Sequence, residues 1–246
     1  MIKIIVYLTK LVAIAFVAML FASCKYSIDL GRGEKGSGTI TTQTRAINSD
    51  FSKIEVSNGI EVIVEQSDDK SVTVATDDNL QKLIVTKVEN GVLIVEADKS
   101  YNATETPRVT VKMPVIKGLS ADSGAEIKSQ NTLITPLLAV ESDSGSTINI
   151  TVEADAITLE SASGSTIEAS GKALKLETTS ESGSSIDAEK LMANEVIAQS
   201  NSGSSTDVYP ILKLDAKASS GSSINYHKAP KNLSKEESSG GSVDEE

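Results

Sequence analysis

The chain has 246 residues, of which 34 are acidic and 23 are basic, so its formal net charge at pH 7 is −11. Such an acidic balance argues against binding nucleic acid or anionic lipid by charge. The chain contains one histidine, His227, and one cysteine, Cys24, which argues against Ser-His and Cys-His catalysis and against histidine-rich metal sites. We therefore expect a protein that is not an enzyme and that holds no cofactor and no metal.

Residues 1–23 have the features of a secretory signal peptide. Lys3 and Lys10 give it a positive start, and an unbroken apolar run of 12 residues extends from Leu11 to Ala22. A run of this length is too short to span a bilayer, which takes about 20 helical residues. The signal contains no acidic residue, so its removal leaves a chain that is still more acidic.

The sequence Leu20-Phe21-Ala22-Ser23-Cys24 ends this signal and is typical of a lipobox. We predict cleavage before Cys24 and acylation of its thiol, which makes the protein an outer-membrane-associated lipoprotein facing the periplasm or the cell surface. The alternative is an ordinary secreted protein with a spare thiol, although an unpaired exported cysteine is a liability. In the first case a membrane is one partner, through the lipid anchor.

Two segments precede the most regular part of the chain. Residues 24–49 combine glycine, serine, threonine and mixed charges, which predicts a flexible tether. Residues 50–115 contain several stretches in which apolar and polar residues alternate, and Asn90-Gly91 between two of them is a hairpin or corner signal. We expect an irregular β-rich part here.

Residues 116–243 contain a repeat that is centred on a Ser-Gly pair. The glycines are separated by 21, 19, 19, 20 and 18 residues, and a looser copy follows at Ser239-Gly240-Gly241. We take these glycines to be the corners of the repeat: Gly124, Gly145, Gly164, Gly183, Gly203 and Gly221. Near-constant spacing of this length is typical of a solenoid, in which each repeat buries its apolar face against its neighbours.

The residues around each glycine predict the structure of one repeat. Apolar residues alternate with polar ones on both sides of it, as in Leu138 and Val140 before Gly145, and in Ile148 and Ile150 after it. This period of two indicates half-buried strands joined by a corner, where glycine enters positive φ without steric cost. About 19 residues leave no room for a helical crossover, so we predict a right-handed parallel β-helix, or β-solenoid, in an all-β protein.

Small residues recur at two further positions of the repeat. Serine stands directly before every corner glycine, as at Ser163, and serine or alanine stands three positions before it, as at Ser161. We interpret both as ladders that point into a narrow corner, and we expect Ser163→Leu to overfill it. A catalytic serine would not be repeated at every corner.

Phe51-Ser52-Lys53-Ile54-Glu55-Val56-Ser57-Asn58-Gly59-Ile60-Glu61-Val62 resembles the opening of the head GIN domain family of autotransporter adhesins. The repeated Ser-Gly-Ser corners and Ser239-Gly240-Gly241-Ser242 extend the resemblance over about residues 50–243. It implies a right-handed β-helical fold and an exported protein or lipoprotein of a Bacteroidetes-type bacterium. The family defines no binding residues that carry over to this chain.

Few residues are candidates for ligand contact. The chain has no tryptophan, and Tyr209 and Tyr226 are the aromatic residues of the regular repeats that could offer surface contacts. Glu168, Asp187 and Asp207 stand four positions after successive glycines, so they form an acidic column that either attracts a cation or is a solvated face. We favour the solvated face.

These observations favour a non-enzymatic, lipid-anchored cell-envelope protein whose solenoid presents an adhesin-like or scaffold surface to an unknown protein or matrix partner. One alternative is a β-helix that binds glycans or cleaves polysaccharides. Enzymes of that kind use paired carboxylates, calcium and arginines, and after Arg45 this chain has one arginine, Arg108. Another alternative is a periplasmic partner of an envelope-stress or transport system.

Overall fold

The computed structural model describes residues 33–47 and 49–246, which contain strands and turns but no helix. The segment expected to be the signal peptide, residues 1–23, and the expected lipidation site Cys24 lie outside the described residues. Within the described part, no helix meets the length and apolarity needed to cross a membrane. The residues from Glu34 to Glu246 form one compact unit.

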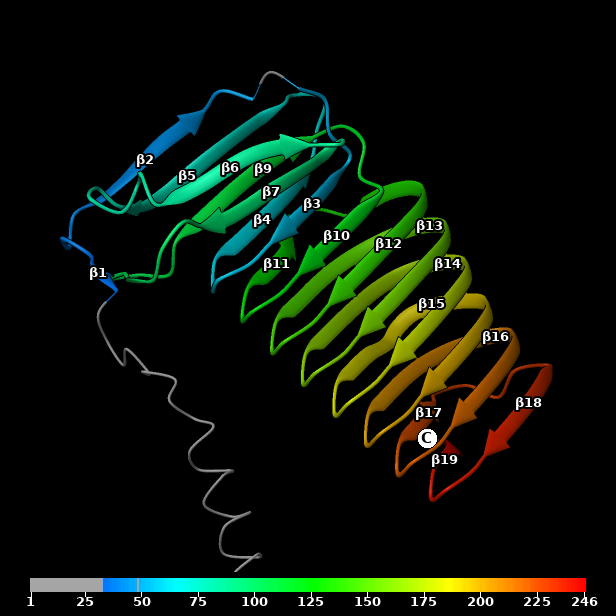
Figure 1. Ribbon diagram of the computed structural model, residues 1–246. Helices are drawn as coiled ribbons and strands as arrows, with labels where there is room; N and C mark the ends of the chain where they lie inside the picture. The colour runs from blue at the N-terminus through cyan, green and yellow to red at the C-terminus, as the bar shows by residue number, and fades with distance from the viewer. Residues whose placement is uncertain (1–32, 48) are drawn as a thin grey trace, which may run out of the picture. The chain divides into compact units, whose positions relative to one another are not determined.

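The second half of this unit is a stack of parallel coils (Figure 1). Successive coils are in register at the turns, so that Thr147, Thr166, Ser185, Ser205 and Ser223 stand in one column. The register shifts near the bend on both sides of β15. The strands are β10 (Gly118–Ala121), β11 (Glu126–Ser129), β12 (Leu133–Ser142), β13 (Thr147–Ser161), β14 (Thr166–Ser180), β15 (Ser185–Ser200), β16 (Ser205–Ala218), β17 (Ser223–Tyr226), β18 (Asn232–Glu237) and β19 (Ser242–Glu245). The predicted all-β parallel solenoid is confirmed.

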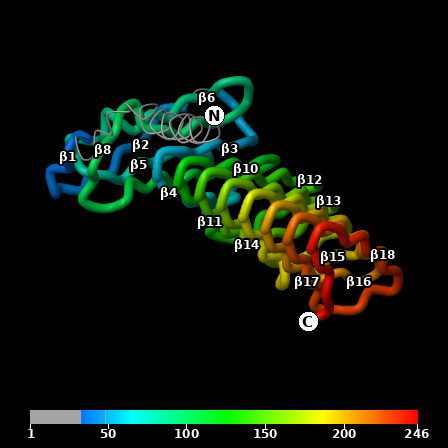
Figure 2. The backbone as a smooth tube through the Cα atoms, turned by 60° about the horizontal axis from the view of Figure 1, so that its bottom comes forward, coloured from blue at the N-terminus to red at the C-terminus, as the bar shows by residue number. Residues whose placement is uncertain are grey.

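The core of the stack consists of the alternate residues that the repeat brings into register. Ile148, Ile167 and Ile186 lie one above another and are fully buried. The residues next to each isoleucine along its own strand face outward. Each buried aliphatic side chain contributes roughly 1.5–3 kcal/mol relative to an exposed one. Figure 2 follows the backbone along these coils and shows how closely one repeats the next.

The Ser-Gly pairs form the tight turns along one edge of the stack (Figure 1). In the turn at Ser163-Gly164, φ is 53° for the serine and 72° for the glycine, and the Ser165 amide donates to the Ala162 carbonyl at 3.2 Å. Two successive residues at positive φ closed by this bond define a type I′ turn. The same pair of positive angles occurs at every corner of the repeat.

The serine before each glycine does not point into the coil. Ser163 and its equivalents are exposed, because the turn directs their side chains to solvent. The expectation that they form an internal ladder is therefore wrong. The internal ladder is formed by the serine after the glycine, such as Ser165 with 1% exposure, and by the residue three positions before it, such as Ser161 with 2% exposure.

The buried hydroxyls link successive coils. Ser165 Oγ donates to the Ser142 carbonyl of the preceding coil at 2.6 Å and lies 2.8 Å from Ser161 Oγ. It also accepts from the Ala162 amide at 3.2 Å. The next coil repeats the arrangement, with Ser184 Oγ donating to the Ser161 carbonyl at 2.6 Å. The corner is therefore filled by small polar groups whose hydrogen bonds are satisfied, as burial requires.

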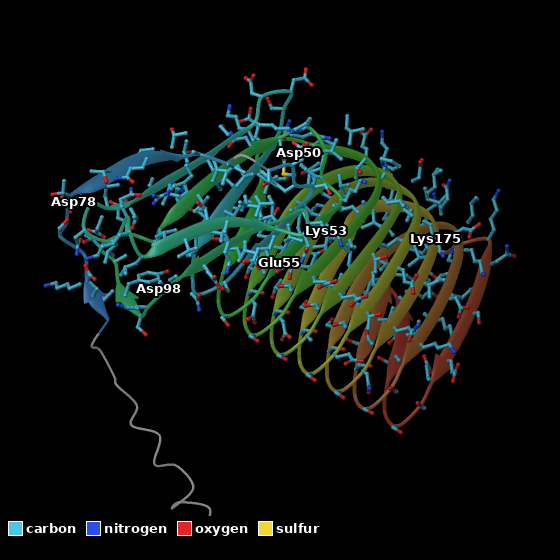
Figure 3. All side chains as sticks on the ribbon, turned by 45° about the horizontal axis from the view of Figure 1, so that its top comes forward. Asp50, Lys53, Glu55, Asp78, Asp98 and Lys175 are labelled. Carbon is cyan, nitrogen blue, oxygen red and sulfur yellow. The ribbon has the colours of Figure 1, made fainter. Side chains whose placement is uncertain are left out.

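The first coil of the stack is formed by residues that the sequence placed in the irregular part. Strands β3 (Lys53–Val56) and β4 (Glu61–Gln66) are joined by a turn at Asn58-Gly59, with φ of 63° and 69°. Asn-Gly replaces Ser-Gly here, since asparagine also tolerates positive φ. This coil pairs with β10 and β11 on one side, and Lys53 and Glu55 lie on its outer face (Figure 3).

On its other side the first coil pairs with strands that come before β10 in the sequence. β3 pairs in parallel with β7 (Val92–Ala97), and β4 pairs in parallel with β9 (Arg108–Met113). After the first coil, the chain forms the strands on one side of that coil. It then crosses to the other side, where β10 and β11 continue the stack. Spatial order and chain order therefore differ at this end, whereas they agree from β10 onward.

Antiparallel strands complete this end of the unit. The hairpin predicted at Asn90-Gly91 joins β6 (Ile84–Glu89) to β7, and both turn residues have positive φ. β5 (Ser71–Asp77) pairs antiparallel with β9 and with β2 (Ile40–Arg45). The short strands β1 (Glu34–Lys35) and β8 (Tyr101–Asn102) pair in parallel.

The tether predicted for residues 24–49 is wrong for its described C-terminal part, because β1 and β2 belong to the fold. The fully buried carboxylate of Asp77 accepts from the Gly38 amide at 2.8 Å and from the Thr104 amide at 2.9 Å. Arg45 donates to the Gln81 carbonyl at 2.7 Å. This segment is therefore attached to the fold by specific hydrogen bonds, although most of its side chains are exposed.

The position of the inward serine leads to a stability prediction. Ser165→Leu should overfill a corner that is closed by the coils on both sides, and overpacking of this kind costs about 1–3 kcal/mol. Ser163→Asn, two residues away, should change the free energy of unfolding by no more than about 0.5 kcal/mol, since asparagine suits positive φ. Urea unfolding of both variants measures the difference, and equal losses would contradict the assignment of the inward serine.

Candidate functional site

The six corner glycines lie in the tight turns, with φ between 70° and 72°. A Cβ atom built on any of them meets no other atom within 4 Å. Glycine is therefore needed there for its backbone conformation and not for space. This argues that the edge formed by the turns has a structural role.

The two candidate tyrosines differ in exposure. Tyr209 is partly exposed, and the Lys228 ammonium lies 5.9 Å from the centre of its ring. Tyr226 is only 4% exposed and belongs to the core. The ammonium of Lys235, an exposed residue, lies 4.9 Å from its ring centre. The expectation that Tyr226 offers a surface contact is wrong, because it occupies an inward position of the last coils.

The predicted acidic column is present, since Glu168, Asp187 and Asp207 are in register on β14, β15 and β16. Amide side chains flank it at both ends. Asn149 Nδ2 donates to Glu168 Oε2 at 2.6 Å, and Asn225 Nδ2 donates to Asp207 Oδ1 at 2.9 Å. The Glu189 amide donates to Asp187 Oδ1 at 3.2 Å, so each of the three carboxylates already accepts a hydrogen bond.

Arg108 takes part in an ion cluster at the first coil. Its Nε donates to Glu61 Oε2 at 2.6 Å, and Lys128 Nζ lies 3.2 Å from Glu61 Oε1. Burial raises the pKa of the Glu61 carboxyl, but the hydrogen bonds and charges of Arg108 and Lys128 outweigh this effect and hold the pKa below its ordinary value. The cluster joins β4, β9 and β11, so this arginine is engaged in holding the coils together.

A groove with a volume of about 700 Å³ lies where the coils bend, at the edge opposite the Ser-Gly turns. It extends across β12, β13, β14, β15 and β16. Its lining is formed by Ile134, Thr135, Pro136, Glu153, Ala154, Asp155, Lys172, Ala173, Leu174, Met192, Asn194 and Ile211. Most of these side chains are apolar, and charged ones stand among them.

Large apolar side chains are exposed along this bend. Ile134 is 66% exposed, Leu137 63% and Leu174 56%. We define the apolar row as Ile134, Leu137, Leu174, Met192 and Leu212. It reaches from β12 to β16, four coil steps and so roughly 19 Å at 4.8 Å per step, with no large apolar member on β13. Leu233 is also exposed, but it continues the inward column of Leu214 in the last coil. Isolated apolar side chains on a surface need no explanation, but several of them near one edge make this bend the candidate interaction surface.

Charges of both signs border the apolar row. Lys175 on β14, Glu195 on β15 and Lys213 on β16 are aligned in one column. Figure 3 shows Lys175 at this edge of the stack, with its side chain pointing away from the coils. An apolar centre with a charged rim is the usual composition of a protein-binding surface. The row therefore can bind by burying apolar area, and the rim can orient what binds.

The sequence did not reveal the apolar row. Its members fall where each coil bends, and there the alternation of inward and outward residues changes phase. Leu174, for example, stands between Ala173 and Lys175, whose partners Ala193 and Glu195 flank the matching bend in β15. The members of the row stand at different distances from the turn glycines, so no single repeat position signals the row in the sequence.

The chain matches the family model for "Putative auto-transporter adhesin, head GIN domain" over residues 50–230. No curated protein matches it. Among solved structures, a "putative adhesin" from Bacteroides fragilis has a TM-score of 0.82 and 21% identity, covering 87% of this chain and 100% of its own. A "putative lipid binding protein" from Parabacteroides distasonis has a TM-score of 0.72 and 20% identity, covering 86% and 98%.

A third solved structure, a "putative adhesin" from Parabacteroides merdae, has a TM-score of 0.68 and 18% identity, and the match covers 86% of this chain and 98% of that one. The three similarities extend over nearly the full length of the known structures. At these identities they show that the fold is shared.

The Glu61 cluster should make stability depend on acidity. The pKa of Glu61 in the folded protein lies below its unfolded value of about 4.5, so the cluster stabilises the fold above that pH. This contribution to the free energy of unfolding is lost as the pH falls through the folded pKa. Glu61→Gln should lower the free energy of unfolding at pH 7 by roughly 1–2 kcal/mol and reduce its fall on acidification. Urea unfolding between pH 7 and pH 3 measures both effects.

Glu65→Gln is the matched control, because Glu65 pairs with Lys112 at 3.0 Å on the same strand but is more exposed, at 30% against 9% for Glu61. It should cost less than about 1 kcal/mol. A pH profile of Glu61→Gln that runs parallel to that of the unaltered protein would contradict the role of the cluster.

Proposed function

Because the chain belongs to the family of auto-transporter adhesins with a head GIN domain, we propose that it is a non-enzymatic, adhesin-like binding protein of the cell envelope. We propose further that it recognises a protein partner through the apolar row at the bend of the coils. The observation that carries this proposal is the exposure of large apolar side chains near the bends of β12, β14, β15 and β16 in an acidic protein.

The composition of the groove favours a protein over a lipid. An acyl chain in the groove would desolvate Glu153, Asp155 and Lys172, which is costly because an acyl chain offers charged groups no partner. A protein surface can provide counter-charges and hydrogen bonds for them. Because one relative is described as a lipid-binding protein, a lipid is the competing occupant of the groove.

The same composition argues against a glycan. Glycan sites present aromatic rings as stacking platforms, and none of the groove-lining residues is aromatic. Tyr209 lies on β16 outside the groove lining, next to Lys228. A polysaccharide-cleaving site would need positioned acid and base groups with an arginine free to bind substrate. Arg108 is paired with Glu61 instead.

The anchoring of the protein is part of the proposal. The lipobox-like end of the signal at Cys24 supports an N-terminal acyl anchor in the outer membrane. The first described strand begins at Glu34. The anchor would tether the solenoid to the membrane, either in the periplasm or at the cell surface.

A first experiment places a photo-crosslinking amino acid at Leu174 in the native organism. We expect one protein to be trapped there and at Met192, whereas the same group at Glu177, on the same strand but outside the apolar row, should not trap it. The dissociation constant for the purified partner should then rise by about tenfold or more in Leu174→Glu, since a central apolar contact contributes about 1–3 kcal/mol.

Glu177→Lys is the control for a change of charge on the same strand and should leave binding unchanged. Glycan arrays and fluorescent fatty acids are the competing probes. The proposal of a protein partner would be overturned by specific glycan binding that is lost when Tyr209 is substituted. Fatty-acid binding that is lost in Leu174→Glu would overturn it as well.

The anchor is tested separately. Cys24→Ala should move the protein from the membrane fraction to the soluble envelope or medium fraction, because acyl insertion contributes about 0.8 kcal/mol per buried CH₂. Fractionation and immunoblotting measure the distribution, with Ser27→Ala as the control. Unchanged membrane association of the Cys24→Ala variant would rule out the acyl chain as the sole attachment.

A further inference from the structure

Three side chains with metal-ligating groups meet at the C-terminal end of the stack. Asp207 is on β16, His227 directly follows β17, and Glu246 directly follows β19. One ligand atom from each lies within 4.8 Å of the others. These residues are about 20 positions apart along the sequence, and the parallel pairing of β16, β17 and β19 brings them together.

The register explains why the three side chains share one face. Asp207 pairs with Asn225, and Asn225 pairs with Asp244, so these three residues form one outward column. His227 and Glu246 come two residues after Asn225 and Asp244, and successive outward residues along a strand are two apart. The imidazole therefore lies beside the outward column and not in the core.

The imidazole of His227 has a nitrogen without a partner. Its Nε2 atom is buried from solvent and forms no hydrogen bond, although Asp207 Oδ1 is 3.7 Å away. That distance is too long for a hydrogen bond. A buried nitrogen that faces a carboxylate without bonding to it requires an explanation, because an unmade hydrogen bond costs free energy.

A shared metal ion explains this geometry. Two ligands on one tetrahedral Zn²⁺, each at about 2.0–2.1 Å, stand about 3.4 Å apart, close to the separation of His227 Nε2 and Asp207 Oδ1. Glu246 is exposed, so its carboxylate is able to rotate onto the same ion. We propose that Asp207, His227 and Glu246 bind a divalent transition metal of the Zn²⁺ class, with water completing the coordination.

Such an ion would fasten the end of the solenoid. Among the described residues, β19 pairs with one strand, β17, over four residues. β18 is exposed along its entire length. A coil that has a neighbour on one side only is less stabilised than a coil inside the stack. A metal bridge from β19 to β16 would add a link across two coils.

The test is calorimetric titration of the purified full-length protein with ZnCl₂, followed by the same titration of variants. His227→Ala and Asp207→Asn should each weaken Zn²⁺ binding by about tenfold or more, since even the loss of an outer-shell partner costs that much. Asp244→Asn removes one negative charge from the same surface outside the cluster and should leave the affinity unchanged. Ca²⁺, which prefers oxygen ligands, should not compete.

Hydrogen exchange provides a second measurement. Zn²⁺ should slow exchange of the amides of residues 242–246 in the unaltered protein and not in His227→Gln, which retains a polar side chain of similar size. Unchanged urea unfolding of the variants without metal verifies that they fold. Equal binding of Ca²⁺ and Zn²⁺, or Zn²⁺ binding that survives in His227→Ala, would assign the ion to the acidic surface and overturn the proposal.

Discussion

The structure depends on the continuity of one hydrogen-bond ladder through a turn that must recur at every coil. Parallel coils stay in register only if each turn has the same length and the same backbone geometry. Here the turn places two successive residues at positive φ, and the amide of its glycine donates to the carbonyl of the equivalent serine in the next coil, as Gly164 does to Ser182 at 3.2 Å. The ladder therefore passes through the turns without a break.

The space inside these turns admits only small side chains, and the chain fills most of it with serine hydroxyl groups and the rest with alanine. Each buried serine, such as Ser165, satisfies a carbonyl of the preceding coil and an amide of its own turn. Thr206 continues the scheme in the coil where it replaces isoleucine, because its hydroxyl lies 2.7 Å from Ser200 Oγ. A polar column inside a β-solenoid is thus consistent with stability, since its members are hydrogen-bonded.

The two edges of the stack are under different constraints. The turn edge is restricted to glycine and to small or polar residues by its backbone conformation. At the bend, residues such as Pro136, Asp155, Leu174 and Asn194 stand at corresponding places, so this edge tolerates variation. Function usually lies where a rigid scaffold leaves side chains free to vary. This is the physical reason for looking for the binding surface at the bend and at the terminal coil.

The sequence alone determined the solenoid, the length of its coils, the position of the corner glycines and the acidic column, because a repeat in sequence must be a repeat in space. It also predicted the hairpin at Asn90-Gly91. It could not assign Ser163 and Ser165 to the outside and the inside, since that depends on the exact turn type. Nor could it place β3 and β4 between β7, β9 and the later coils, because nothing local shows that the chain returns across its first coil. The exposure of Leu174, the burial of Tyr226 and the meeting of Asp207 with His227 and Glu246 depend on register between strands, which only the tertiary structure decided.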